Sequence, residues 1–196
     1  MKKGKEASIE TKVILLGDSG VGKTSLIKVV TNGEFNENEF SSTYSSYRIK
    51  ELKINSQNYS LNLWDTIGQE KFRSLSEIFF KGSDIAIFVY DITSKESFDN
   101  LNYWIGKLKE NVPENKCIFG IVGNKTDEYR KQEVNENNAK EFAKSKGIKF
   151  AAVSAKMDPT SFENFLIELV KDASNNLLDK PENLSLKNQK KKKGKC

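Results

Sequence analysis

The 196-residue sequence contains no histidine, and this absence excludes several kinds of chemistry. Without an imidazole there is no Ser-His-Asp hydrolysis, no zinc site with histidine ligands and no histidine-based pH switch. The two cysteines, Cys117 and Cys196, are too few for a disulfide framework or a four-cysteine zinc site, and they fit a reducing compartment. Any catalysis must therefore use carboxylates, amides, lysines, backbone dipoles or a hard metal ion.

Long apolar runs are also missing. The longest uninterrupted apolar stretch is Ile85 to Tyr90, which is far shorter than the roughly 20 residues that a membrane-spanning helix needs. The only early apolar run, Val13 to Leu16, is too short for the hydrophobic region of a signal peptide. We therefore expect a cytoplasmic protein that is not secreted.

The net charge of +5 is concentrated at the two ends of the chain. Residues 180–196 contain seven lysines and one acid, whereas residues 13–179 carry a slight excess of acids. Because nucleic-acid-binding domains usually carry their basic patch on the fold itself, we expect no nucleic-acid partner. The lysine-rich end fits an anionic membrane surface, although a solubilising or nuclear-targeting tail explains a lysine run equally well.

Apolar runs alternate with helical patterns from residue 12 to about residue 178, which predicts a doubly wound α/β domain. The first 11 residues are interpreted as a basic extension, and the Asn- and Lys-rich residues 179–196 as a disordered tail. Two alternating strands joined by residues 55–58 predict a hairpin at one edge of the sheet. The predicted strands are Lys12–Gly17, Ser46–Ile54, Tyr59–Trp64, Asp84–Asp91, Lys116–Val122 and Ile148–Val153. The predicted helices are Lys23–Val30, Phe72–Lys81, Lys95–Asn111, Asn135–Lys146 and Pro159–Leu178.

Residues 17–24, Gly-Asp-Ser-Gly-Val-Gly-Lys-Thr, fit the phosphate-loop pattern G-x4-G-K-[ST] between a buried strand and a helix. Glycines let successive backbone N–H groups converge on phosphate oxygens, and the helix N-terminus adds about half a positive charge. In such a loop Lys23 reaches the phosphates and the Thr24 hydroxyl binds Mg²⁺. The candidate phosphate-binding residues are Ser19, Gly20, Val21, Gly22, Lys23, Thr24 and Ser25. Kinases, ATPases and GTPases share this loop, so it does not identify the nucleotide.

Two further motifs follow later predicted strands, and they point to a guanine base. In Asn124-Lys125-Thr126-Asp127, the carboxylate of Asp127 can accept hydrogen bonds from guanine N1–H and the exocyclic amine. Adenine offers no such pair of donors and would leave the carboxylate unpaired. In Ser154-Ala155-Lys156, a backbone amide could bind the guanine O6 atom. Both motifs come at carboxyl ends of strands, where ligands bind in open α/β sheets.

These motifs, together with Trp64-Asp65-Thr66-Ile67-Gly68-Gln69-Glu70, resemble those of a small GTPase of the Ras superfamily. Within it, residues 71–75, 79–82 and 89–93 resemble the Rab branch. The resemblance covers residues 12 to about 178. It implies the P-loop NTPase fold of small G proteins, with a mostly parallel six-stranded sheet, helices on both faces and one antiparallel edge strand. It also implies GTP and GDP as ligands, Mg²⁺ as cofactor, and a switch in intracellular vesicle trafficking.

The resemblance further implies roles for individual residues. The base would be contacted by Asn124, Asp127 and the Ala155 amide, with Ser154 in the same motif and the stems of Lys125 and Lys156 packed along base and ribose. Asp65 would hold Mg²⁺ through water, the Gly68 amide would sense the γ-phosphate, and Gln69 would orient the attacking water. Phe35 sits where the family places an aromatic ring against guanine, although a loop aromatic capping the core is an equally good interpretation.

The sequence departs from the Rab pattern before and after the predicted hairpin. Ser42 and Thr43 are both candidates for the Mg²⁺ ligand of the first switch, because alignment favours one and residue type the other. Ile67 stands where the family has alanine, and its β-branched side chain would crowd the second switch. These departures leave an alternative open, namely a guanine-nucleotide-binding scaffold with little or no hydrolysis. Only three arginines occur and none is marked as a catalytic finger, so we expect slow hydrolysis without an activating protein.

Rab proteins usually end in two cysteines, whereas this sequence has Cys196 alone after a lysine cluster. A prenyl group on Cys196 plus the lysines would supply two membrane-anchoring signals, and an unmodified cysteine is the alternative. The expected partners are an exchange factor, a GTPase-activating protein, effectors and the cytosolic face of an endomembrane, with the protein itself a monomer. A P-loop small-molecule kinase fits the phosphate loop but has no use for the two base motifs. A nucleic-acid-binding module fits only the tail.

Overall fold

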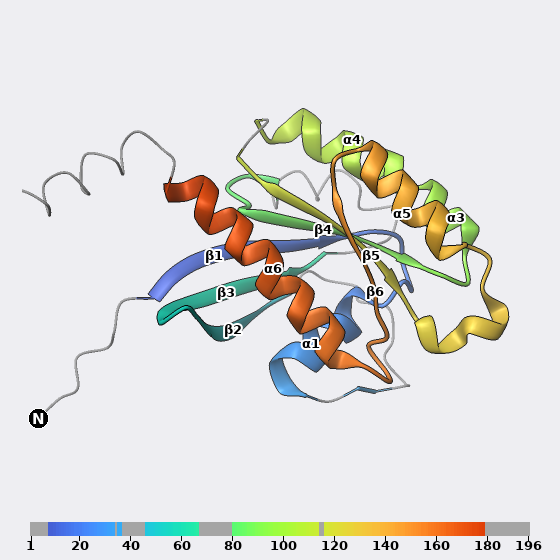
Figure 1. Ribbon diagram of the computed structural model, residues 1–196, viewed down its shortest axis with the longest axis horizontal. Coiled ribbons are helices and arrows are strands. Elements are labelled where there is room, and N and C mark those ends of the chain that lie inside the picture. The colour runs from blue at the N-terminus through green and yellow to red at the C-terminus, as the bar shows by residue number, and fades with distance from the viewer. Residues whose placement is uncertain (1–7, 34, 37–45, 67–79, 114–115, 179–196) are drawn as a thin grey trace, which may run out of the picture.

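The computed structural model describes residues 8–33, 35–36, 46–66, 80–113 and 116–178, which form a six-stranded sheet with helices on both faces (Figure 1). The strands are β1 Ser8–Leu16, β2 Ser46–Ile54, β3 Gln57–Asp65, β4 Ile85–Asp91, β5 Ile118–Asn124 and β6 Lys149–Ala152. The helices are α1 Lys23–Asn32, α3 Lys95–Asp99, α4 Leu101–Asn111, α5 Glu136–Ser145, α6 Pro159–Leu178 and the 3-10 helix η2 Thr126–Lys131.

The strand order is β2-β3-β1-β4-β5-β6, and only the β2–β3 pair is antiparallel. A two-residue turn joins β2 to β3, because pairing continues as far as Ile54 and Gln57. Asn55 and Ser56 in this turn have φ values of +48° and +66°. A turn with two left-handed residues matches the right-handed twist of a hairpin, and asparagine tolerates that conformation well. The predicted antiparallel edge strand is confirmed, with a tighter turn than expected.

Alternate side chains of the central strands enter two separate cores. Val13 and Leu15 of β1 face α1 and α6, whereas Ile14 and Leu16 face the layer that contains α4 and α5. Figure 1 shows the same division, with α1 and α6 on one side of the sheet and α3, α4 and α5 on the other. All four side chains are fully buried, and each such burial stabilises the fold by about 1.5–3 kcal/mol. Strands covered on both faces are why these segments are almost continuously apolar.

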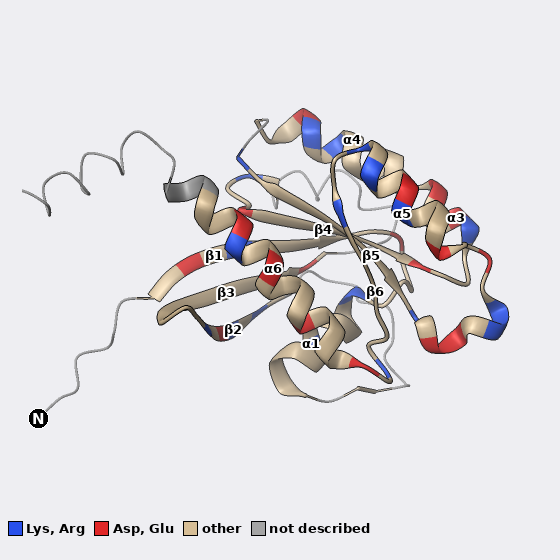
Figure 2. Ribbon diagram, in the orientation of Figure 1, with Lys and Arg blue, Asp and Glu red and all other residues tan. Residues whose placement is uncertain are grey.

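Charged residues of both signs alternate along the outer surfaces of α3, α4 and α5 (Figure 2). Several form pairs one helical turn apart, such as Lys95 with Asp99 and Lys140 with Glu136. Exposed pairs of this kind add only a few tenths of a kcal/mol each to helix stability. Among the described helices, none combines the length and apolar character needed to cross a bilayer.

The observed elements agree with most of the predicted ones, including the bounds of β2 and α6. Three differences matter. Strand β1 begins at Ser8, so residues 8–11 belong to the sheet and not to the predicted basic extension. The predicted helix Lys95–Asn111 is divided at Asn100 into α3 and α4, and β5 extends to Asn124. Most of the predicted helix Phe72–Lys81 and the tail 179–196 lie outside the described residues.

Candidate functional site

The phosphate-loop motif connects the end of β1 to the start of α1, as its sequence predicts. Gly17 follows β1 with φ +147°, and an added Cβ would lie 2.1 Å from the carbonyl oxygen of Val89 in β4. Only glycine can occupy this position, because the backbone of the neighbouring strand fills the space that a side chain would need. Ser19 and Gly20 lie in the following turn, and Ser25 lies in the first turn of α1.

The Lys23 side chain folds back across this loop. Its Nζ donates hydrogen bonds to the carbonyl oxygens of Gly17 at 2.9 Å and Asp18 at 2.7 Å. Burial lowers the pKa of Lys23 to about 8, although the nearby carboxylates of Asp65 and Asp18 act in the opposite direction. The ammonium group is thus held at the N-terminus of α1, where backbone N–H groups already favour an anion. Loop, helix end and lysine together form an anion-binding arrangement.

Thr24 of α1 and Asp65 at the end of β3 bring two oxygen ligands together beside this loop. The Thr24 Oγ1 atom donates to Asp65 Oδ2 at 2.7 Å, and Asp65 is only 3% exposed. A hydroxyl next to a carboxylate is a hard-oxygen donor set, which fits Mg²⁺ and not a soft metal. The other predicted residues of this half of the site, Ser42, Thr43, Gly68 and Gln69, lie outside the described residues, as do Ile67 and Cys196.

Asn124, the last residue of β5, links the phosphate loop to the loop after β6. Its Nδ2 donates to the carbonyl oxygen of Val21 at 2.9 Å, and its Oδ1 accepts from the Ala155 amide at 3.2 Å. Asn124 is buried, with 1% exposure. The sequence interpretation gave Asn124 and the Ala155 amide direct contacts with the base. In the structure Asn124 binds both Val21 and the Ala155 amide and so connects the two loops, while contacts with a base stay a prediction.

The Asp127 carboxylate is held by the motif after β6. The Ser154 Oγ donates to Asp127 Oδ1 at 2.5 Å, and the same oxygen of Ser154 accepts from the Met157 amide at 2.9 Å. Asp127 lies in the short helix η2, which β5 places next to the β6 loop. Ser154 is itself buried, with 3% exposure, so the partner of the carboxylate is a buried hydroxyl group. Lys156 of the same motif is exposed.

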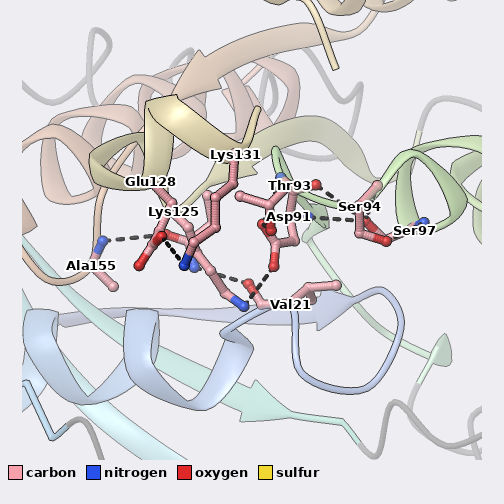
Figure 3. Close-up of polar contacts among 10 residues, drawn as sticks. Val21, Asp91, Thr93, Ser94, Ser97, Lys125, Glu128, Lys131 and Ala155 are labelled. Carbon is pink, nitrogen blue, oxygen red and sulfur yellow. Dashed lines mark hydrogen bonds and ion pairs between the residues drawn. The ribbon is translucent and has the colours of Figure 1, made fainter. Parts of the chain in front are cut away.

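The Lys125 side chain does not join the Ser154–Asp127 pair and instead contacts Asp91 at the end of β4. Its backbone has φ +66°, and its Nζ forms an ion pair with Asp91 Oδ2 at 2.6 Å. Asp91 is buried, and its other oxygen accepts hydrogen bonds from the amide and hydroxyl of Thr93, both at 2.8 Å. Figure 3 shows Lys125 and Thr93 meeting at this carboxylate. Phe35, the predicted base-contacting aromatic, is 38% exposed.

Sequence reasoning missed the role of Asp91. Its position could have revealed this role. Asp91 is the last residue of the buried parallel strand β4, and the other motifs also follow the carboxyl ends of parallel strands. Its partner Thr93, two residues later, completes a local pattern in which a carboxylate accepts from a nearby backbone amide. Sequence reasoning also missed that the side chains of Asn100 and Trp104 bind the carboxylate of Asp18.

The motifs follow the carboxyl ends of β1, β3, β5 and β6, and the strand order reverses at β1, which has β3 on one side and β4 on the other. Ligands of open α/β sheets bind at such a switch point. The phosphate loop there, with its lysine and its hydroxyl–carboxylate pair, defines the class of P-loop nucleoside-triphosphate-binding domains. The sheet with one antiparallel edge strand narrows this class to the fold of the small G proteins.

Comparison with known proteins gives the family. The model of the Ras family matches residues 12–175. The chain is 36% identical over 187 residues to "Ras-related protein Rab-1D" of Dictyostelium discoideum, covering 93% of this chain and 91% of that protein. It is 39% identical over 167 residues to "Ras-related protein Rab-7a" of Paramecium octaurelia, covering 83% and 81%. "Ras-related protein Rab-31" of Rattus norvegicus is 40% identical over 147 residues, covering 75% of each chain. The chain belongs to the Ras family and is a Rab-like small GTPase.

Proposed function

We propose that the protein binds GTP and GDP together with Mg²⁺ and acts as a molecular switch in vesicle trafficking. The observation that carries the choice of guanine is the 2.5 Å hydrogen bond from Ser154 to Asp127. That bond fixes one carboxylate oxygen, so the carboxylate has a defined orientation toward the purine edge. Guanine presents two donors to such a group, and adenine would leave the carboxylate without them.

The phosphates would lie over the loop 17–24, with the Lys23 ammonium exchanging its carbonyl partners for phosphate oxygens. Thr24 and Asp65 would hold Mg²⁺, which when bound neutralises charge on the phosphate oxygens. Ser42 or Thr43 would complete the ligand set from the first switch. The Gly68 amide would contact the γ-phosphate, and Gln69 would orient the attacking water. Positioning and charge neutralisation are sufficient for phosphoryl transfer, so no histidine is needed.

The hydrolysis would be slow until an activating protein supplies further charge, because this chain offers only three arginines. An exchange factor and effectors would act through the two switches. The lysine cluster of residues 190–195 and a prenyl group on Cys196 would bring the protein to the cytosolic face of an endomembrane. The similarity of the chain to Ras-related Rab proteins supports this proposed cycle between cytosol and membrane.

The Asp127→Asn variant tests the base assignment. The asparagine amide can donate to the C2 oxygen of xanthine but opposes the guanine amine, so we expect preference to move from GTP toward XTP by about 100-fold or more. Competition binding of GTP, XTP and ATP measures this shift. Glu128→Gln is the matched control, because Glu128 follows Asp127 and makes only an exposed ion pair with Lys131 among the contacts described. Unchanged preference in Asp127→Asn would reject a guanine site at this position.

A further inference from the structure

The carboxylate of Asp18 lies within the phosphate-loop motif, and two side chains of the α3–α4 segment bind it. Asn100 Nδ2 donates to Asp18 Oδ2 at 2.7 Å, and Trp104 Nε1 donates to Asp18 Oδ1 at 2.8 Å. Asn100 lies between α3 and α4, and Trp104 is in α4, with 3% exposure. Each oxygen of Asp18 thus has its own donor, more than 80 residues away in the sequence.

The two hydrogen bonds to Asp18 matter because its carboxylate would repel a bound phosphate. An anionic side chain next to a bound phosphate repels it, and at a few ångströms this repulsion reaches about 1–4 kcal/mol, depending on the local dielectric constant. Asp18 also contacts the group that attracts phosphate, because its backbone oxygen accepts from Lys23 Nζ at 2.7 Å. A carboxylate without its two donors could turn toward the phosphates, or it could compete with them for the Lys23 ammonium. Either movement would weaken phosphate binding.

We propose that Asn100 and Trp104 are positioning residues that hold the Asp18 carboxylate away from the nucleotide and so slow nucleotide release. The inference rests on the proposed nucleotide binding at the loop 17–24. Asn100 and Trp104 act through Asp18 and touch no reacting group. The same helical segment also contacts the base half of the site, since the Asp91 amide donates to Ser97 Oγ in α3 at 3.1 Å.

The first experiment measures the release rate of a fluorescent N-methylanthraniloyl GDP from the full-length protein. Trp104→Phe removes the indole N–H and keeps an aromatic ring in the core, and Asn100→Ala removes the second donor at a less buried position. We expect each variant to release the nucleotide about 3- to 10-fold faster. Tyr103→Phe is the matched control, because Tyr103 packs edge-to-face on Trp104 and makes no described contact with Asp18. Its release rate should match that of the parent.

The second experiment repeats both substitutions in an Asp18→Ala background. If the donors act only by restraining the carboxylate, Trp104→Phe and Asn100→Ala should no longer change the release rate there. A purely structural role of Trp104 in the core would give the same acceleration in both backgrounds, which would overturn the proposal. Unchanged rates in the parent background would overturn it as well. A parent protein that fails to bind the fluorescent GDP at all would instead contradict the proposed function.

The hydrogen bond itself can be observed without nucleotide turnover. In a Trp64→Phe background the indole N–H resonance of Trp104 is the only one in the ¹⁵N spectrum, because the sequence has two tryptophans. Asp18→Ala should move this resonance clearly, whereas Tyr103→Phe should move it only slightly. If Asp18→Ala leaves the indole resonance unchanged, the hydrogen bond between Trp104 and Asp18 does not form in solution, and the proposal loses its basis.

Discussion

Gly22 lies directly against Asn124, so that a Cβ added to Gly22 would come within 2.3 Å of the Asn124 Nδ2 atom. Gly22 also has φ +95°, a conformation that side chains with a Cβ rarely adopt. The phosphate loop and the end of β5 are therefore packed so closely that only glycine fits between them. This contact brings the Asn124 amide within reach of the Val21 carbonyl oxygen.

The Gly22→Ala variant should lose most of its nucleotide affinity, because Asn124 must move and release either Val21 or Ala155. Gly33→Ala is the matched control at the other end of α1: it has φ +73°, but nothing lies within 4 Å of its added Cβ. It should cost only the backbone strain, about 1 kcal/mol of stability. Thermal unfolding and GDP binding of both variants measure the difference. Equal losses of affinity in the two would show that strain, and not the Asn124 contact, matters.

Replacing Thr24 should uncouple nucleotide release from Mg²⁺. In the parent, chelation of Mg²⁺ by EDTA should accelerate GDP release, because under the proposed assignment the ion would link the phosphates to Thr24 and Asp65. In Thr24→Ala the release should be fast already, and EDTA should add less than about 2-fold. Thr31→Ala is the control on the same helix, since the Thr31 hydroxyl bonds only backbone oxygens of Ile27 and Lys28 among its described contacts. A Thr24→Ala protein with the full EDTA response would contradict this ligand assignment.

Breaking the ion pair between Lys125 and Asp91 should weaken the base half of the site. Asp91→Asn keeps the shape but removes the charge that holds Lys125, so we expect guanine nucleotide affinity to fall by about 3- to 10-fold. Lys95 and Asp99 form an exposed pair on the neighbouring helix α3, which makes Asp99→Asn the control. Direct titration of both variants with GDP checks this. An Asp91→Asn protein with parental affinity would assign the pair to fold stability alone.

Nucleotide binding should take up protons near pH 8. Burial lowers the pKa of Lys23 to about 8 in the protein without ligand, so its ammonium group titrates close to this pH. Phosphate charge raises this pKa on binding. Affinity should therefore be at its full value below pH 8 and fall as the pH rises above it.

Calorimetric titration with GDP at pH 8, in two buffers of different ionisation enthalpy, should give a net uptake of protons on binding. Lys12 also has a lowered pKa through burial, but its Nζ binds the Lys81 carbonyl oxygen away from the phosphate loop. Lys12→Gln should therefore leave the uptake unchanged. No difference between the two buffers would mean that Lys23 is already fully charged before the nucleotide arrives.

Local patterns in the sequence predict the sheet and the loops of the site well. Continuous apolar runs mark strands buried on both faces, and the motif Asp158-Pro159 marks the start of α6, where Asp158 Oδ1 accepts from the Ser161 amide. The start of β1 is less visible, because Ile9 is the only apolar residue among residues 8–12. Their place in the sheet depends on pairing with β3, from Ser8 opposite Asn58 onward. Such pairing is a long-range property that no local pattern contains.

The partners of the site residues are harder to predict than the residues themselves. Motif spacing indicates Asp127 and Lys125, but nothing in the spacing indicates that Ser154 binds one and Asp91 the other. The contact of Asp18 with Trp104 joins the phosphate loop to α4, 86 residues away in the sequence. These pairings follow from strand order and helix packing. They become visible only when the whole chain is folded.

The single amide of Asn124 that spans Val21 and Ala155 has a thermodynamic consequence. If a pyrophosphate fragment orders the phosphate loop, Asn124 passes this order to the loop after β6, where a nucleoside would bind. The two fragments are therefore expected to help each other, and the intact nucleoside diphosphate should be held more tightly than the product of the separate affinities suggests. Dissociation of either the pyrophosphate or the nucleoside part would loosen both loops, so release of the ligand should be cooperative.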